Sequence, residues 1–198
     1  MVEYEKKILL KKEEYHVLKN LIFSECPDIT QKNYYYDQKD FAFNKCGTTC
    51  RIRRKNKKWE ITVKKHNAFT DGGNSENTRL FTGKYDDSWF RSIGLVCFGA
   101  LKTTRNVLSP CKYVLFMLDR NEYLDTEDYE LEAEYAQDHE AEAQNEISKI
   151  ARLLFLYCRT ATEEFSSRVN AGKSKSERFF EIVMRSEKER GKNEIGHR

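Results

Sequence analysis

Polar and apolar positions alternate most clearly between Asp128 and Tyr135, where the sequence reads Asp-Tyr-Glu-Leu-Glu-Ala-Glu-Tyr. A period of two predicts a β-strand, because successive side chains of a strand point to opposite faces. One face would then carry Glu130, Glu132 and Glu134, spaced about 7 Å apart along the strand. Because aligned carboxylates repel one another, we expect a metal cation, Lys and Arg side chains, or bulk water to face them.

The same alternation predicts further strands, most of them joined as hairpins or interrupted by a helix. They are expected at residues 2–9, 30–37, 48–54, 57–65, 78–82, 98–108 and 112–120. With the acidic strand, this makes about eight strands in total. On several of them, long ionisable side chains share one face and apolar side chains share the other. The polar faces are formed by Glu3, Glu5 and Lys7; Arg51 and Arg53; Glu60, Thr62 and Lys64; and Thr103 and Arg105.

Apolar residues at helical spacing predict amphipathic helices over residues 11–23 and 139–158. Shorter helices are expected at residues 85–93 and from Ser174 onwards. We expect a connection at residues 38–47, a loop at 66–77 and a turn at 121–127. The charged end at residues 185–198 is expected to fray.

Composition narrows the class of protein. The chain of 198 residues fits a single domain over residues 1–198, with its core at about 2–180. Aromatic content of 13% excludes disorder, and a net charge of +3 argues against a generic nucleic-acid binder. The charged start predicts no signal peptide, and no apolar run is long enough for a membrane span.

The cysteines favour a cytoplasmic location. The six residues are scattered along the chain, as is usual for reduced thiols. Cys46 and Cys50 could form half of a zinc site, but no second Cys/His pair has suitable spacing. The histidines form no cluster either. We therefore expect no zinc centre. Since no apolar run is long enough for a membrane span, we also expect no membrane partner.

The distribution of charge favours an α+β fold built on a closed eight-stranded antiparallel β-barrel, with a charged lumen and helices packed outside. The alternative is a plain α+β domain whose polar faces are solvated. Buried ion pairs give little net stability for their desolvation cost, so a densely charged lumen suggests a function. A polyanionic ligand held together with Mg²⁺ or Mn²⁺ would suit carboxylates and basic groups on the same strands.

Several motifs in one order resemble a known family. Glu3-Tyr-Glu5-Lys-Lys7 is similar to the Glu-x-Glu-x-Lys signature that opens the CYTH superfamily, the triphosphate tunnel metalloenzymes. The later motifs, in order, are Arg51-Ile-Arg53, Thr62-Val-Lys64, Asp119 and Glu130-Leu-Glu132-Ala-Glu134. Residues 33–37, 118–123 and 128–132 look most like the firmicute-type subgroup. The resemblance covers about residues 2–180.

This resemblance implies a tunnel fold, a triphosphate-containing small molecule as substrate and an obligate divalent cation. The implied metal ligands are Glu3, Glu5, Glu130, Glu132 and Glu134. The implied phosphate-binding residues are Lys7, Arg51, Arg53, Lys64, Arg105, Lys175 and Arg178. Lys7 and Glu132 are the candidate catalytic residues. One departure is Thr103, which stands where many members have Lys, so one phosphate contact would be weaker or made by a hydroxyl.

Three functions remain open, because one scaffold serves several reactions. The first is a metal-dependent triphosphatase that hydrolyses the terminal phosphate, with inorganic tripolyphosphate favoured over nucleoside or thiamine triphosphate. The second is a class IV-type adenylyl cyclase that makes cyclic AMP from ATP. The third is a non-catalytic module that binds polyphosphate or nucleotide.

Overall fold

The computed structural model describes residues 3–55, 58–66, 74–81 and 84–195. Its strands are β1 (Glu3–Leu10), β2 (Ile29–Asp37), β3 (Thr48–Lys55), β4 (Lys58–His66), β5 (Asn74–Phe81), β6 (Val96–Cys111), β7 (Val114–Tyr123) and β8 (Thr126–Ala136). Its helices are α1 (Lys12–Leu21), α2 (Ala42–Lys45), α3 (Ser88–Ser92), α4 (Glu140–Cys158), α5 (Thr162–Ser167) and α6 (Lys175–Ile195), with a 3₁₀ turn, η1, at Gln137–His139.

Contacts divide the chain into two compact units, which we describe separately. Unit 1 comprises residues 1–30, 103–122 and 127–172, and unit 2 comprises residues 31–102, 123–126 and 173–198. The long strand β6 therefore begins in unit 2 and ends in unit 1. The prediction of a single domain over residues 1–198 stays a prediction.

Hydrogen bonds join the strands in the order β1-β8-β7-β6-β2-β3-β4-β5. The pairs β1–β8, β2–β3, β3–β4 and β4–β5 are antiparallel. An antiparallel sheet accompanied by helices confirms the α+β class. Strands β1 and β5 stand at the two ends of this order, so the described strands are not closed into a ring by hydrogen bonds. The closed eight-stranded barrel is therefore not confirmed.

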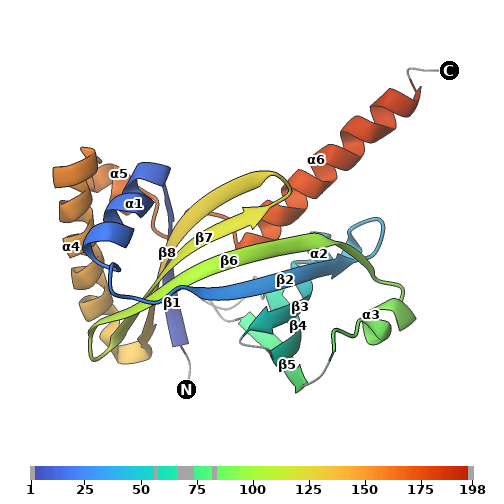
Figure 1. The fold of residues 1–198 in the computed structure, drawn as a ribbon, viewed down its shortest axis with the longest axis horizontal. Helices are drawn as coiled ribbons and strands as arrows, with labels where there is room; N and C mark the ends of the chain where they lie inside the picture. The colour runs from blue at the N-terminus through green and yellow to red at the C-terminus, as the bar shows by residue number, and fades with distance from the viewer. Residues whose placement is uncertain (1–2, 56–57, 67–73, 82–83, 196–198) are drawn as a thin grey trace. The chain divides into compact units, whose positions relative to one another are not determined.

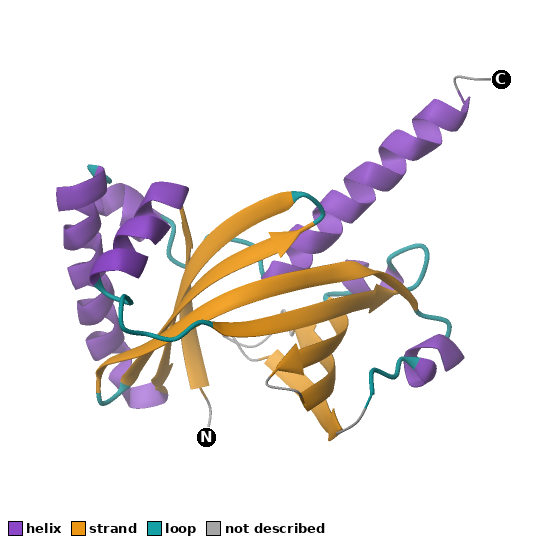
Figure 2. Cartoon of the chain, in the orientation of Figure 1, coloured by secondary structure: helices purple, strands orange, loops and turns teal. Residues whose placement is uncertain are grey.

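In unit 1 the predicted separation of charged and apolar faces is confirmed for β1 and β8. Lys7 lies opposite Glu132, and Glu5 lies opposite Glu134. Because directly opposed residues of antiparallel strands point to the same face, these side chains share one side of the sheet. Ile8 and Leu131 point to the other side and are fully buried. They belong to the core formed with α1, α4 and α5, which Figures 1 and 2 show beside these strands.

Unit 2 has the same two-faced construction in β2, β3 and β4. Arg51 lies opposite Tyr35 on one side and Thr62 on the other, while Arg53 lies opposite Asn33 and Glu60. The opposite face is apolar and packs against Phe90 of α3. Its buried members are Tyr36, Cys50, Ile52 and Trp59.

Helix α6 departs from the prediction that the helices pack outside, on the apolar side. Phe179 of α6 packs against Tyr35, with ring centroids 4.9 Å apart. Since Tyr35 is paired with Arg51, it lies on the charged face of the unit 2 sheet. The first turns of α6 therefore cover part of that face, because Tyr35 and Leu101 supply apolar surface there. The expectation that helices pack outside, on the apolar side, is wrong for the first turns of α6.

Helix α6 also extends the expected short helix far into the charged end. It starts with a capping box, in which Ser174 N–H donates to Glu177 and Glu177 N–H donates to the Ser174 hydroxyl. It then continues to Ile195. The expected fraying is wrong for residues 185–195, which continue the helix because they are rich in Glu, Lys and Arg, which are good helix formers. Residues 196–198 lie outside the described residues.

Other element boundaries also differ from the expected ones. Strands β7 and β8 run up to a two-residue turn at Leu124 and Asp125, shorter than the expected turn at residues 121–127. Strand β5 begins at Asn74, inside the expected loop at 66–77, whose residues 67–73 lie outside the described residues. Helices α2 and α5 were not expected; they have only four and six residues. In the described part of the chain, no helix has the length and apolar character needed to cross a membrane.

Candidate metal and phosphate site

Three buried carboxylates from neighbouring strands meet in unit 1. Asp119 comes from β7, and Glu130 and Glu132 come from β8. One oxygen of each lies within 4.8 Å of the others, and all three residues are buried. We call these three residues the acidic cluster. Alternation puts Glu130 and Glu132 on one face of β8, and the pairing of β8 with β7 adds Asp119.

Arg105 of β6 is bonded directly to the acidic cluster. Its Nε donates to Asp119 Oδ1 at 2.7 Å and its Nη2 donates to Asp119 Oδ2 at 2.6 Å. The same Nη2 also donates to Glu132 Oε2 at 2.6 Å. Burial alone would lower the pKa of Arg105, but the hydrogen bonds and charge of Asp119, with the charges of Glu132 and Glu130, outweigh it and raise that pKa. The guanidinium therefore bridges β7 and β8 through Asp119 and Glu132.

Lys7 approaches the cluster from β1. Its Nζ lies 3.6 Å from Glu132 Oε1 and 3.3 Å from Glu5 Oε1. The two oxygens of Glu132 thus face two different cations, Lys7 and Arg105. The structure brings together the two candidate catalytic residues, Lys7 and Glu132, as the register of β1 and β8 requires.

The remaining predicted metal ligands are placed differently. Glu5 and Glu134 are paired across β1 and β8, at the next position on the charged face. The Glu5 side chain is 45% exposed, and neither residue belongs to the acidic cluster. The side chain of Glu3 lies outside the described residues. A metal role for Glu3, Glu5 and Glu134 stays a prediction.

Asp119 was missed as a metal ligand by sequence reasoning, although it was part of the family motif. The available signal was a carboxylate inside a mostly apolar strand, where an ionised group must be paired or bound to metal. Asp119 is fully buried between Leu118 and Arg120 along β7. Its position in the motif did not reveal its distance from Glu130 and Glu132, because that distance depends on the pairing of β7 with β8.

A neutral network lies next to the cluster along the same three strands. The Thr103 hydroxyl donates to Asn121 Oδ1 at 2.8 Å, and Asn121 Nδ2 donates to Asp128 Oδ1 at 2.8 Å. Thr103 and Asn121 are both buried. At the position where the resemblance leads one to expect Lys, the Thr103 hydroxyl is therefore engaged with an amide.

Unit 2 carries the other predicted phosphate-binding residues on one face. The register places Arg51, Arg53 and Lys64 on the same side of β3 and β4. Arg53 Nε donates to Asn33 Oδ1 at 2.8 Å, and its Nη1 lies 3.9 Å from Glu60 Oε2. The register confirms that these basic residues share one face of the hairpin. Convergence of their heads on one stretch of a tunnel, and their contact with phosphate, stay predictions.

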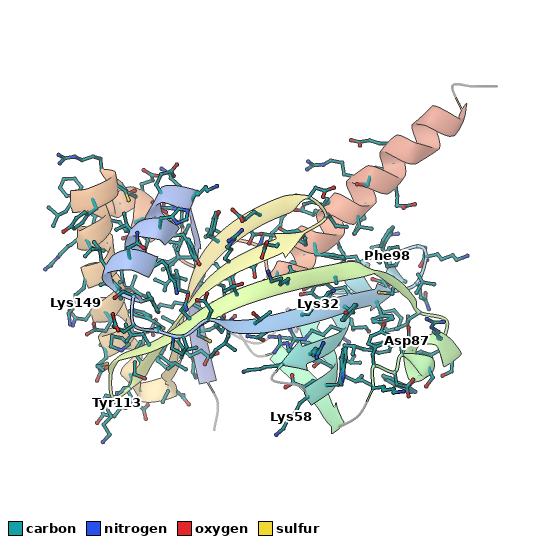
Figure 3. All side chains as sticks on the ribbon, viewed as in Figure 1. Lys32, Lys58, Asp87, Phe98, Tyr113 and Lys149 are labelled. Carbon is teal, nitrogen blue, oxygen red and sulfur yellow. The ribbon has the colours of Figure 1, made fainter. Side chains whose placement is uncertain are left out.

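The opposite face of this hairpin is different in character. Lys32 of β2, labelled in Figure 3, lies opposite Arg54 on this face. Lys58 of β4, also labelled there, lies opposite Lys55 and so shares the face of Arg53 and Glu60. Lys32 Nζ lies 5.1 Å from the ring centroid of Tyr34, and Arg54 lies 5.8 Å from that of Trp59. Arg53 and Arg54 are adjacent in sequence, so their side chains point to opposite faces of β3.

Lys175 and Arg178 lie in the first turn of α6. The Thr49 hydroxyl, on the same face of β3 as Arg51, donates to Ser176 Oγ at 3.0 Å. This bond fixes the start of α6 at the charged face of the unit 2 sheet. Arg178 Nη1 donates to the Lys173 carbonyl at 2.6 Å. Phosphate binding by Lys175 and Arg178 stays a prediction.

Comparison with known proteins identifies the family. The sequence model of the CYTH domain matches residues 1–165. The Bacillus subtilis (strain 168) protein YjbK, provisionally named a triphosphatase, is 31% identical over 153 residues, which span 70% of this chain and 80% of that protein.

The chain belongs to the CYTH family.

Solved structures show the same CYTH fold at lower sequence identity. A provisionally named adenylate cyclase from Bacillus halodurans superposes with a TM-score of 0.64, covering 90% of this chain and 97% of that one, at 23% identity. HpAC1 of Hippeastrum, provisionally named an adenylyl cyclase and described as having a dominant triphosphatase activity, gives a TM-score of 0.56. It covers 73% of this chain and 85% of HpAC1, at 18% identity.

CYTH proteins in general depend on a metal ion, and the acidic cluster has donors that fit one. All three donors are carboxylate oxygens, the type that hard Mg²⁺ and Mn²⁺ prefer. Their mutual separation of up to 4.8 Å is somewhat wider than the spacing of two oxygens on one Mg²⁺ ion, about 3 Å for neighbouring and about 4 Å for opposite ligands, so these side chains would draw together around an ion. Arg105 already places a positive charge against two of the three, which shows that the cluster attracts a cation.

Proposed function

We propose that this CYTH protein is a divalent-metal-dependent triphosphatase that hydrolyses the terminal phosphate of a triphosphate. The observation that carries this proposal is the buried acidic cluster, which lies within direct reach of Arg105 and Lys7. Acidic oxygens for a hard cation and basic groups for phosphate oxygens are the two requirements of metal-assisted phosphoryl transfer.

The residues divide into two roles in this proposal. Asp119, Glu130 and Glu132 would hold Mg²⁺ or Mn²⁺, with Glu3, Glu5 and Glu134 as further candidates. When bound, such an ion neutralises charge on phosphate oxygens and activates water. The phosphate-binding groups would be Lys7, Arg51, Arg53, Lys64, Arg105, Lys175 and Arg178. Glu132 is also our candidate for the general base.

The proposed substrate is inorganic tripolyphosphate, because no motif for recognising a base is evident in the sequence. Nucleoside and thiamine triphosphates are the alternatives. The provisional name of YjbK and the description of HpAC1 support a triphosphatase for those two proteins, and the CYTH fold makes the same activity reasonable here. We also propose that the strands form a closed tunnel around the substrate. We propose a cytoplasmic location for the protein, because its six cysteines are free thiols.

The experiment is a panel that measures phosphate release from tripolyphosphate, ATP, GTP and thiamine triphosphate, with Mg²⁺ or Mn²⁺. We expect release from tripolyphosphate that stops on addition of a chelator. Cyclic AMP and diphosphate from ATP would instead identify a cyclase. Tight binding of tripolyphosphate with no turnover under any metal or pH would identify a non-catalytic module, and would contradict the proposal.

A further inference from the structure

Arg105 holds the position that a cation in the acidic cluster would need. A single nitrogen, Nη2, donates to Asp119 and Glu132 at 2.6 Å each. The two carboxylates come from different strands, β7 and β8, so the guanidinium bridges them. Both are buried, and the Arg105 side chain itself is only 17% exposed.

Charge balance explains why this position is occupied. Three carboxylates whose oxygens lie within 4.8 Å of one another repel strongly when buried together. A forked guanidinium relieves that repulsion with short charge-assisted hydrogen bonds. A divalent ion would relieve it too, but two of its three ligands, Asp119 and Glu132, are the residues that Arg105 already binds. A cation bound to Asp119 and Glu132 would therefore compete with Arg105, which already donates to both oxygens of Asp119 and to Oε2 of Glu132.

We propose that Arg105 is an internal counter-ion of the acidic cluster, which a divalent cation displaces, so that metal binding frees the guanidinium for a phosphate group. This inference rests on the proposed function, because it takes the acidic cluster as the metal site. It goes further by assigning Arg105 two alternative partners. Metal and phosphate binding are then coupled through one side chain, and the coupling is reciprocal.

The coupling has a direct consequence for affinity. In the free protein, metal must compete with the guanidinium, which weakens metal binding. Removing Arg105 should therefore strengthen metal binding and weaken binding of the triphosphate. A residue that only gripped phosphate would lower triphosphate affinity and leave the affinity for metal alone unchanged.

The first test is calorimetric titration of Mn²⁺, with no phosphate present, into the wild type, Arg105→Gln and Arg105→Lys. Loss of the three charge-assisted bonds that Arg105 makes to the cluster should lower the Kd for Mn²⁺ in Arg105→Gln on the order of tenfold. Arg105→Lys keeps the charge but not the fork, so its Kd should lie between the two. At saturating Mn²⁺, Arg105→Gln should bind tripolyphosphate more weakly than the wild type.

Arg120→Gln is the matched control. Arg120 is the residue after Asp119 on β7, so its side chain points to the other face, where it pairs with Glu127. Its Kd for Mn²⁺ should equal that of the wild type. Equal Kd values in the wild type and Arg105→Gln would overturn the counter-ion inference and leave the proposed function standing. No detectable Mn²⁺ or Mg²⁺ binding by any variant would overturn the metal site itself.

A second measurement uses the wild type, in case the variants fold poorly. The Nε–H proton of Arg105 is bonded to Asp119, so its NMR signal should be protected from exchange with solvent in the free protein. Titration with diamagnetic Mg²⁺, without phosphate, should shift that signal and remove its protection. A signal that stays protected and unshifted at saturating Mg²⁺ would show that the guanidinium keeps its place, and the inference would be wrong.

Discussion

Glu14 illustrates how a single buried carboxylate can tie distant segments together in unit 1. It accepts hydrogen bonds from the Lys11 N–H and the Thr160 hydroxyl, each at 2.8 Å. It also accepts a forked pair from Arg168, at 2.9 and 2.7 Å. Burial favours its neutral form, but these bonds outweigh burial, so the pKa of Glu14 lies below its ordinary value of 4.5. One residue thus caps α1 and anchors the segments around α5.

The first prediction concerns this carboxylate. A lowered folded-state pKa means that its contribution to stability is complete above pH 4.5 and is lost as pH falls through the folded value. Glu14→Gln should lower the free energy of unfolding at pH 7 by about 2–4 kcal/mol, because it leaves Arg168 with a neutral partner. Urea unfolding at pH 7 and at pH 3 should show a smaller difference between wild type and variant at the acidic value.

Glu13→Gln is the control for this prediction, since Glu13 is adjacent in sequence and exposed. It should change the free energy of unfolding by less than about 0.5 kcal/mol. If Glu14→Gln proved as mild as Glu13→Gln at pH 7, the forked ion pair would not be an important source of stability.

At the scale of elements, the register of paired strands determines which side chains meet. Alternation along β8 was enough to predict that Glu130, Glu132 and Glu134 share a face, and β1 supplied Lys7 by the same reasoning. Alternation could not predict which carboxylates form a cluster, because that depends on the pairing of β7 with β8. The position of α6 was also beyond reach, since Phe179 and Tyr35 are far apart in sequence and no local pattern links them.

The turn between β7 and β8 was also misjudged, for a local reason. Leu124 and Asp125 have φ values of 46° and 58°, as a two-residue type I′ turn requires. Leu-Asp is much less typical of such a turn than Asn-Gly, so the residue types alone do not indicate a two-residue turn here. The hairpin forms because the long flanking strands are held by their pairing and burial.

The second prediction follows from this turn. Asp125→Gly should raise the free energy of unfolding by about 0.5 kcal/mol, because glycine adopts a positive φ without strain. For a chain of this length, the melting temperature should rise by about 1–2 °C. Thr126→Gly, at the next residue and inside β8, is the control and should lower it. A melting temperature of Asp125→Gly below that of the wild type would contradict the assigned turn.

At the scale of the whole molecule, the charged residues of the candidate site on the strands fall into two sets, one in each compact unit. Unit 1 holds the acidic cluster with Lys7 and Arg105, and unit 2 holds Arg51, Arg53 and Lys64 on one face of a hairpin. Sequence reasoning named the members of both sets except Asp119, but it also proposed Glu5 and Glu134 as metal ligands, and these lie outside the acidic cluster. A triphosphate would need basic groups from more than one strand, because it carries several separate phosphate groups.

The third prediction tests the unit 2 set. Tripolyphosphate with Mg²⁺, at about a hundred times its Kd, should stabilise the wild type by about 2.7 kcal/mol, seen as a rise of several degrees in melting temperature. Orthophosphate at equal concentration and ionic strength should do much less. Arg53→Ala should reduce the tripolyphosphate shift, having removed a forked donor, and Arg53→Lys should restore it in part.

Arg54→Ala is the matched control for this test, because Arg54 lies on the opposite face of β3, over Trp59. Its ligand-induced shift should equal that of the wild type. Orthophosphate that stabilised the protein as strongly as tripolyphosphate would show that the site does not recognise a phosphate chain, and it would contradict the triphosphatase proposal.

The strict alternation of β8 also restricts how this gene can change in length. Deletion of one residue between Asp128 and Tyr135 would exchange the two faces of the rest of the strand. The carboxylates after the deletion would then point towards α4, and the apolar side chains would point towards Arg105 and Lys7. A single deletion would thus undo the core and the acidic cluster together, whereas a point substitution would affect one of them. Insertions and deletions that survive selection should therefore avoid this strand and collect in connecting loops.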